Sequence, residues 1–207
     1  AIYEVGEKSG SPFIVMQYVE GVTLSTFPRN DIRELVRLMR DTALAVHGAH
    51  EKGIIHRDLK PANIMVGQKE SAHIYVMDFG LAKETEVDTS ISQSGLVLGT
   101  PAYMSPEQAR GKAKSMDARS DVYSLGATLY ELLTGRPPFR DHEVLELLRK
   151  VVEIDPPLVR KMKPQVDLDL ETIVMKCLRK EPGKRYPTAA ALAEDLENYL
   201  KGESISA

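Results

Sequence analysis

The sequence holds one cysteine, no tryptophan and no long apolar run among its 207 residues. A single cysteine, Cys177, excludes an intramolecular disulfide and is compatible with a reducing compartment. Because Cys177 sits in an apolar helical stretch, we expect a buried structural thiol rather than a nucleophile. No stretch approaches the ~18 apolar residues of a membrane-spanning helix, and we identify no charged-then-apolar leader. These features indicate an ordinary soluble chain.

The chain also has no excess of charge of one sign. It has 27 Lys and Arg residues against 30 Asp and Glu residues, which gives a net charge of −3. A general binder of nucleic acid or of anionic membranes would show a basic excess or stripe, so both classes are disfavoured. One domain with a sizeable core is expected, because a chain of ~150 to 200 residues hides roughly 70% of its unfolded surface.

Hydrophobic periodicity predicts a short β region followed by a mainly helical one. β-favouring runs at 2–7 and 12–20 predict a hairpin, and Gly21 ends the second run. Apolar residues at helical spacing predict helices over 31–52, 121–133, 141–152, 168–178 and 189–200. Residues 82–100 have no apolar period and are predicted to form a mobile loop. The pattern predicts an α+β fold without internal repeats.

Three short sequence motifs indicate what chemistry the chain supports. Residues 56–63 read HRDLKPAN, DFG follows at 78–80, and SPE stands at 105–107. Each tripeptide alone is weak, but their order and separation resemble those of the eukaryotic-type protein kinases. The resemblance extends over essentially the whole chain. It implies the mainly helical large lobe of a kinase, preceded by a terminal β-hairpin remnant of the small lobe.

The residue types in these motifs suit phosphoryl transfer from a nucleotide. That reaction requires oxygen ligands for Mg²⁺, a cation and an acceptor for the hydroxyl proton. Asp58 is expected to orient the substrate hydroxyl and take its proton, and Lys60 to meet the γ-phosphate. Asn63 and Asp78 are expected to hold the metal. Any one of these residues alone is more simply a solvated polar residue, but their joint placement favours the site.

The resemblance also implies an ATP pocket near the start of the chain. Met16 matches the position that guards the back of the adenine pocket, and Gln17 to Val19 would present backbone groups to the adenine edge. Met65 matches the floor beneath the adenine, although a methionine in a strand is more often plain core. ATP and Mg²⁺ are the cofactors that the resemblance implies.

Other matched residues are expected to support this site. Asp121 would accept hydrogen bonds from the backbone of the catalytic loop and hold it rigid. Its alternative role is that of a helix N-cap, and both roles can hold together. Arg185 resembles the arginine that pairs with the glutamate of the third motif, here Glu107, in a buried salt bridge.

The substrate class follows from two segments. Residues 99–108 are similar to the substrate-facing segment of Ser/Thr kinases, and the LKPxN context of Lys60 favours Ser/Thr over Tyr specificity. Within the family, residues 105–111 and 117–123 most resemble the eukaryotic-like Ser/Thr kinases of bacteria. Protein substrates with Ser or Thr are therefore expected, with no nucleic acid as partner, and a small-molecule kinase is the less favoured reading.

Regulation is expected to involve Arg57, which precedes the catalytic aspartate. An arginine there can bind a phosphate on the activation loop through charge-assisted hydrogen bonds. The candidate phosphorylation sites are Ser92 and Ser94, with Thr89 and Ser90 next. Thr100 is expected to contact Asp58 and Lys60 instead. The alternative is a hydrophilic loop with no regulatory role.

The five histidines carry no ligand spacing. His56 follows Ile54 and Ile55, which predicts a packed structural histidine rather than an acid or base. Surface or packing roles are the default for the others, which are His47, His50, His73 and His142.

The pattern of the family is incomplete in this sequence. The 14 glycines include no G-x-G-x-x-G, and the one lysine before the hinge is Lys8, in the hairpin turn. We expect a fragment, with residues 1–21 as small-lobe strands and hinge, 22–202 as large lobe and 203–207 as tail. The alternative is a pseudokinase-like scaffold, which has no physical reason to keep an intact metal constellation.

The activity expected of the parent protein differs from the activity expected of the 207 residues alone. The parent is expected to be a cytoplasmic Ser/Thr kinase, which segments outside the chain could anchor to a membrane, and a kinase-domain dimer is possible. The 207-residue chain alone is expected to transfer phosphate slowly or not at all, because half of the electrostatic clamp on the nucleotide is missing.

Overall fold

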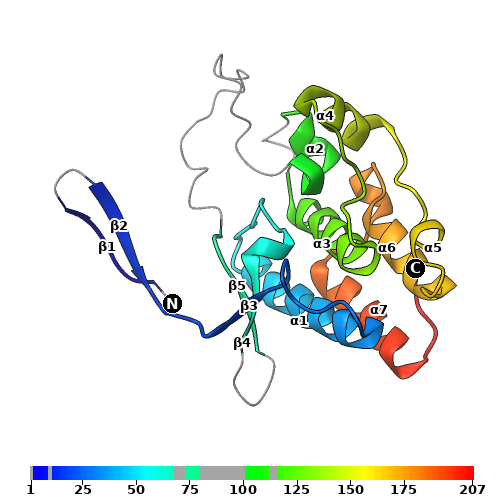
Figure 1. Cartoon of the computed structure of the whole chain (residues 1–207), viewed down its shortest axis with the longest axis horizontal. Coiled ribbons are helices and arrows are strands. Elements are labelled where there is room, and N and C mark those ends of the chain that lie inside the picture. Colours follow the sequence, from blue (N-terminus) through cyan, green and yellow to red (C-terminus); the bar gives the residue numbers. More distant parts are fainter. Residues whose placement is uncertain (1, 9–10, 68–72, 80–100, 112–115) are drawn as a thin grey trace.

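The structure is a computed structural model that describes residues 2–8, 11–67, 73–79, 101–111 and 116–207. The predicted loop at 82–100 lies outside these residues. Most of the regular secondary structure is helical, and two small sheets lie toward the N-terminal end of the fold (Figure 1). Among the described residues no helix is both long and apolar enough to cross a membrane.

Seven α-helices follow one another in the described part of the chain. They are α1 Ile32–His50, α2 Pro106–Ala109, α3 Ala118–Thr134, α4 Val144–Glu153, α5 Val159–Met162, α6 Leu168–Cys177 and α7 Ala189–Lys201. Short 3-10 turns lie at Pro61–Asn63 (η1), Pro101–Tyr103 (η2) and Pro182–Lys184 (η4). Polar N-caps start several of these helices, such as Asp31 at α1 and Thr188 at α7, because their side chains accept backbone N–H groups of the first turn.

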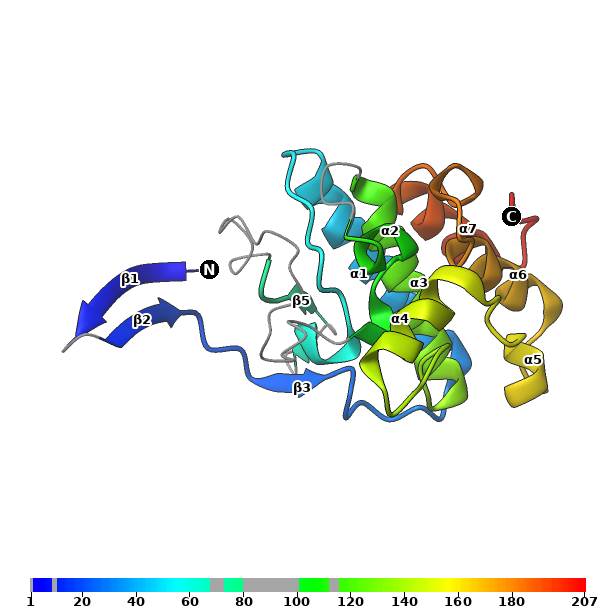
Figure 2. The same ribbon diagram turned by 90° about the horizontal axis from the view of Figure 1, so that it is seen from above.

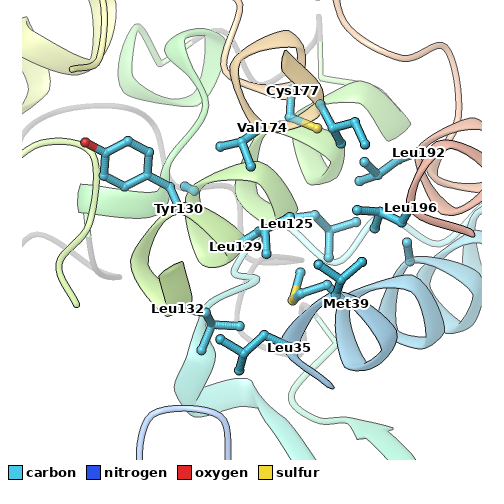
Figure 3. Packing of buried hydrophobic residues seen from close by; sticks show 14 of the residues in the cluster. Leu35, Met39, Leu125, Leu129, Tyr130, Leu132, Val174, Cys177, Leu192 and Leu196 are labelled. Atoms are coloured by element: carbon cyan, nitrogen blue, oxygen red, sulfur yellow. The ribbon is translucent and has the colours of Figure 1, made fainter. Parts of the chain in front are cut away.

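The core forms around α3, which packs against α1, α6 and α7. Leu125 and Leu129 of α3 lie between side chains of α1, such as Met39, and side chains of α6 and α7 (Figure 3). Cys177 is fully buried in this cluster, and burial raises the pKa of its thiol. The thiol is therefore the structural group that the sequence predicts.

Two predicted helix starts are wrong by three residues. The helix predicted from Asp121 begins at Ala118, and its N-cap is Asp117, whose side chain accepts from the backbone N–H of Arg119. The first turn is polar, so apolar periodicity could not detect it, and Asp121 is not the N-cap. Similarly, α4 begins at Val144 rather than 141, because Asp141 accepts from the backbone N–H of Glu143 and stays outside the helix.

The strands form two separate antiparallel sheets. β1 (Ile2–Lys8) pairs with β2 (Ser11–Met16), and this hairpin projects away from the helices (Figures 1 and 2). β3 (Gly21–Thr23), β4 (Ile64–Gly67) and β5 (Ile74–Val76) make the second sheet, in that order. This three-stranded sheet packs on α1 through β5 and contacts η1 through β3.

The prediction that Gly21 ends a strand over 12–20 is wrong. β2 stops at Met16, and Gly21 opens β3, where it faces Gly67 of β4. A Cβ atom at position 21 would collide with the carbonyl oxygen of Val66, so the close approach of the two backbones requires glycine.

Candidate active site

The side chain of Asp121 binds the backbone of the loop that contains Asp58. The fully buried carboxylate of Asp121 accepts the backbone N–H of His56 at 2.8 Å and that of Arg57 at 2.9 Å. Arg57 has a φ of 68°, a conformation that costs a non-glycine residue of order 1–3 kcal/mol unless its surroundings enforce it. The anchor from α3 therefore supports a strained backbone directly beside Asp58.

His50 adds a third donor to the same carboxylate. Its Nε2 atom lies 2.7 Å from Oδ2 of Asp121, and its side chain is only 6% exposed. The prediction of a plain surface or packing role for His50 is wrong, because the ring binds the group that anchors the catalytic loop. The residues stand 71 positions apart, so no local spacing could reveal the pair.

His56 is buried, as predicted, and also joins two loops of the site. Its Nε2 lies 2.7 Å from the carbonyl oxygen of Met77, and its Nδ1 accepts the N–H of Asp58 at 3.3 Å. A carbonyl only accepts, so this geometry places the proton on Nε2. The His56 ring also packs on Phe79, with ring centroids 4.7 Å apart. The ring therefore links Asp58 to the segment around Asp78.

The structure brings Asp58, Lys60 and Asn63 together. Lys60 Nζ lies 2.9 Å from Oδ2 of Asp58, and Asn63 Nδ2 donates to the carbonyl oxygen of Asp58 at 2.8 Å and to its Oδ2 at 3.2 Å. The side chain of Asp58 is 36% exposed, so its carboxylate is accessible while being oriented by a cation and an amide.

Asp78 lies next to this group. The backbone N–H of Met77 donates to the carbonyl oxygen of Asn63 at 2.8 Å, which fixes the end of β5 beside η1. Asp78 is exposed and has a φ of 58°. The described residues contain no cluster of three His, Cys, Asp or Glu side chains suited to a metal. One carboxylate and one amide oxygen still suit Mg²⁺, which commonly takes few protein ligands and completes its shell with phosphate oxygens and water.

A cavity of about 560 Å³ opens beside Asp78. Its walls include residues that the resemblance assigns to the adenine pocket, Met16, Gln17, Val19 and Met65, together with Asp78, which is expected to hold the metal. The remaining lining residues are Tyr18, Tyr75, Val76, Met77 and Phe79. A largely apolar cavity of this volume, with an aspartate among its lining residues, fits an aromatic ring that carries a charged group.

Glu107 and Arg185 form the bidentate pair that the sequence predicts. Arg185 Nη1 and Nη2 lie 2.7 and 2.8 Å from the two carboxylate oxygens, and both residues are buried. Burial alone would raise the pKa of Glu107, but hydrogen bonding and charge from Arg185 lower it below its ordinary value. This pair fixes α2, and with it residues 101–109, against the segment before α7.

Two further residues of the site escaped the sequence reasoning. Tyr103 donates its hydroxyl to Glu131 of α3, which also binds Arg29 through Oε1 at 3.3 Å. Burial and the bond to Glu131 raise the pKa of Tyr103. Gln108 donates from Nε2 to the carbonyl oxygen of Arg57 at 2.7 Å. Both contacts join segments far apart in sequence, and no motif spacing signals them.

Several predicted residues lie outside the described part of the chain. They are Gly80, Thr89, Ser90, Ser92, Ser94 and Thr100. Arg57 is described, and its buried Nε has no hydrogen-bond partner among the described residues.

Comparisons with known proteins agree with this geometry. The family model described as protein kinase domain matches residues 1–196. Serine/threonine-protein kinase PknB of Mycobacterium leprae is 42% identical over 98% of this chain, and that of Mycolicibacterium smegmatis is 41% identical over 100%. The chain spans about a third of the length of these relatives, 33% and 34% respectively.

A solved structure supports the fold independently. The kinase domain of PknI from Mycobacterium tuberculosis superposes with a TM-score of 0.72 at 23% identity, over 95% of this chain and 70% of that one. The mainly helical fold with a small β remnant is therefore the kinase fold. The family match and the relatives together show that the chain belongs to the protein kinase family, among the bacterial eukaryotic-like Ser/Thr kinases.

Proposed function

We propose that the protein containing this chain transfers the γ-phosphate of ATP to Ser and Thr hydroxyls of protein substrates. The observation that carries the proposal is that the side chains of Lys60 and Asn63 both lie within hydrogen-bond distance of the Asp58 carboxylate, beside Asp78 and an apolar cavity. A family fold alone would not specify an activity, but these side chains have the chemistry that phosphoryl transfer requires.

Each member of the group has a distinct role in this proposal. Asp58 orients the substrate hydroxyl and accepts its proton as the oxygen attacks the γ-phosphorus. Lys60, now paired with Asp58 at 2.9 Å, contacts the γ-phosphate and offsets its charge. The carboxylate of Asp58 is then free to meet the incoming hydroxyl.

Asn63 and Asp78 would hold Mg²⁺ in the proposed site, and the metal would neutralise phosphate charge when bound. The cavity lined by Met16 and Met65 would take the adenine, and Gln17 to Val19 would offer it backbone groups. The residues fit both groups: the cavity is largely apolar, and the exposed residue Asp78 is part of its lining.

Regulation is proposed to act through Arg57. Its buried Nε, without a hydrogen-bond partner among the described residues, suits a phosphate that brings several acceptor oxygens. Phosphorylation of Ser92 or Ser94 is the proposed source of that phosphate. Phosphopeptide mass spectrometry of the active intact protein tests this, and finding both serines unmodified would remove it.

We assign residues 1–21 to the last small-lobe strands and hinge, 22–202 to the large lobe and 203–207 to a tail. ATP-dependent chemistry fits a cytoplasmic kinase domain, and a kinase-domain dimer stays a prediction. The 207 residues contain no G-x-G-x-x-G, so the chain alone is expected to transfer little phosphate.

The proposal is tested by incubating the intact protein with ATP labelled in the γ-phosphate, Mg²⁺ and a panel of peptides. Transfer to Ser and Thr peptides, absent when the hydroxyl residue is replaced by Ala, is expected. Nucleotide binding without any transfer would instead support a pseudokinase-like binding module, and transfer to small molecules alone would favour a small-molecule kinase.

A further inference from the structure

We propose that Gln108 is a positioning residue for the phosphoryl transfer: its side-chain amide ties α2 to the peptide unit that joins Arg57 to Asp58. This inference rests on the proposed function and adds to it a residue outside the catalytic loop. Gln108 would act through Asp58 and would not itself touch the reacting atoms.

The amide of Gln108 makes two side-chain contacts in opposite senses. Its Nε2 donates to the carbonyl oxygen of Arg57 at 2.7 Å, and its Oε1 accepts the backbone N–H of Ser105 at 3.0 Å. A carbonyl can only accept and an N–H can only donate, so the two partners together fix the orientation of the amide. The side chain therefore bridges the start of α2 and the catalytic loop.

The bridged carbonyl belongs to a peptide unit that is held at both polar atoms. Gln108 binds the oxygen of the Arg57–Asp58 unit, and Nδ1 of His56 accepts its N–H at 3.3 Å. The preceding N–H, that of Arg57, is bound by Asp121. Because a peptide unit is planar, fixing its oxygen and its N–H fixes the Cα atom of Asp58, from which the side chain extends toward Lys60 and Asn63.

The need for this support comes from the backbone of Arg57. Its φ of 68° is unfavourable for an arginine, so the loop would relax if the contacts that enforce it were lost. Relaxation of Arg57 turns the next peptide unit, and Asp58 follows. A displacement of about 1 Å in a positioned catalytic group can cost on the order of 100-fold in rate.

The chemistry of the side chain separates this role from helix capping. Gln108 and Ser105 form a reciprocal capping box at the start of α2. Glutamate serves equally well at this position of a capping box, because only its oxygen is used. Glutamate at neutral pH has no N–H to donate to the carbonyl oxygen of Arg57. Replacing Gln108 with glutamate should therefore preserve the capping role and abolish the positioning role.

The test compares two variants of the intact protein. Gln108→Glu keeps the capping oxygen and removes the donor, whereas Ser105→Ala removes the serine side of the cap and keeps the donor. We measure kcat, KM for ATP and for a Ser peptide, the thermal unfolding midpoint, and amide exchange of the segment at 55–60. The last readout reports the loop itself, independently of turnover.

For Gln108→Glu we expect kcat to fall about 10- to 100-fold, KM for ATP to change less than about twofold, and exchange at 55–60 to accelerate. Ser105→Ala keeps the donor to the carbonyl oxygen of Arg57, so amide exchange at 55–60 should stay unchanged in this variant. If Gln108→Glu lowers the unfolding midpoint, Gln108→Met removes the donor without adding charge, and the same loss of kcat is expected.

Wild-type kcat and unchanged exchange in folded Gln108→Glu would overturn the inference, as would an equal acceleration of exchange at 55–60 in Ser105→Ala. Either result would leave the proposed function standing. Absence of transfer by the unsubstituted protein would instead refute the proposed function, and this inference with it.

Discussion

The Nε2 atom of His50 and the Oδ2 atom of Asp121 lie 2.7 Å apart in the interior, between α1 and α3. The same carboxylate accepts two backbone N–H groups of the catalytic loop, from His56 and Arg57. A buried carboxylate needs its hydrogen-bonding capacity satisfied, and three donors achieve this here. The pair therefore connects the helical core to the loop that presents Asp58.

Replacing His50 with Ala should lower both stability and turnover. Loss of one donor to a buried carboxylate costs about 1–3 kcal/mol in the free energy of unfolding, and loosening Asp121 should lower kcat as well. Urea denaturation and steady-state assays measure the two effects. His47→Ala is the matched control on the same helix, because His47 is half-buried and lies 4.0 Å from exposed Glu51. Equal effects of the two substitutions would contradict this account.

The contrast between His50 and His47 shows which contacts can be predicted from the sequence and which cannot. Helical periodicity predicts α1, α6 and α7 well, because their buried faces repeat along the chain. Motif spacing correctly predicts that Asp58, Lys60 and Asn63 lie close together, because the three residues belong to one short segment. The contact of His50 with Asp121 depends on how α1 and α3 pack, and Gln108 reaches Arg57 from another segment. Tertiary packing sets both contacts, and neither leaves a local pattern.

Breaking the Glu107–Arg185 pair should destabilise the fold strongly. Glu107→Gln leaves a buried guanidinium without its counter-charge, which typically costs about 3–5 kcal/mol in unfolding free energy. Arg185→Met should cost more, since Arg185 also donates to the carbonyl oxygens of Arg179, Arg119 and Lys180. The double variant Glu107→Gln/Arg185→Met should lose less than the sum of the single changes. Strictly additive losses in denaturant unfolding would argue against direct coupling.

The same pair should make stability depend on pH in the acid range. Arg185 lowers the pKa of Glu107 in the folded state, while the unfolded carboxyl keeps its ordinary value of 4.5. Its contribution is therefore complete above pH 4.5 and is lost as the pH falls through the lower, folded pKa. The stability difference between the unsubstituted protein and Glu107→Gln should shrink as the pH falls below 4.5 and through the lower, folded pKa. A difference that stays constant over this range would contradict the shift.

Adding a single methyl group at Gly126, where α3 crosses α6, should destabilise the protein. A Cβ atom at Gly126 would overlap the Cβ of buried Cys177, which cannot move without shifting the helix backbone. Gly126→Ala should cost about 1–3 kcal/mol in thermal or denaturant unfolding, despite the better helix propensity of alanine. Gly48→Ala in α1, where no atom lies within 4 Å of the added group, should instead stabilise the protein by about 0.5–1 kcal/mol. Stabilisation by both substitutions would refute the close contact.

The most direct test of the central claim is the comparison of the intact protein with its Asp58→Asn variant. We measure transfer of labelled γ-phosphate to a Ser/Thr peptide, and the affinity for ATP and Mg²⁺ in parallel. Asparagine keeps the size of the side chain but cannot accept the hydroxyl proton as a carboxylate does, so transfer should fall to background while ATP binds with near-normal affinity. Transfer by Asp58→Asn at the rate of the unsubstituted protein would contradict the account.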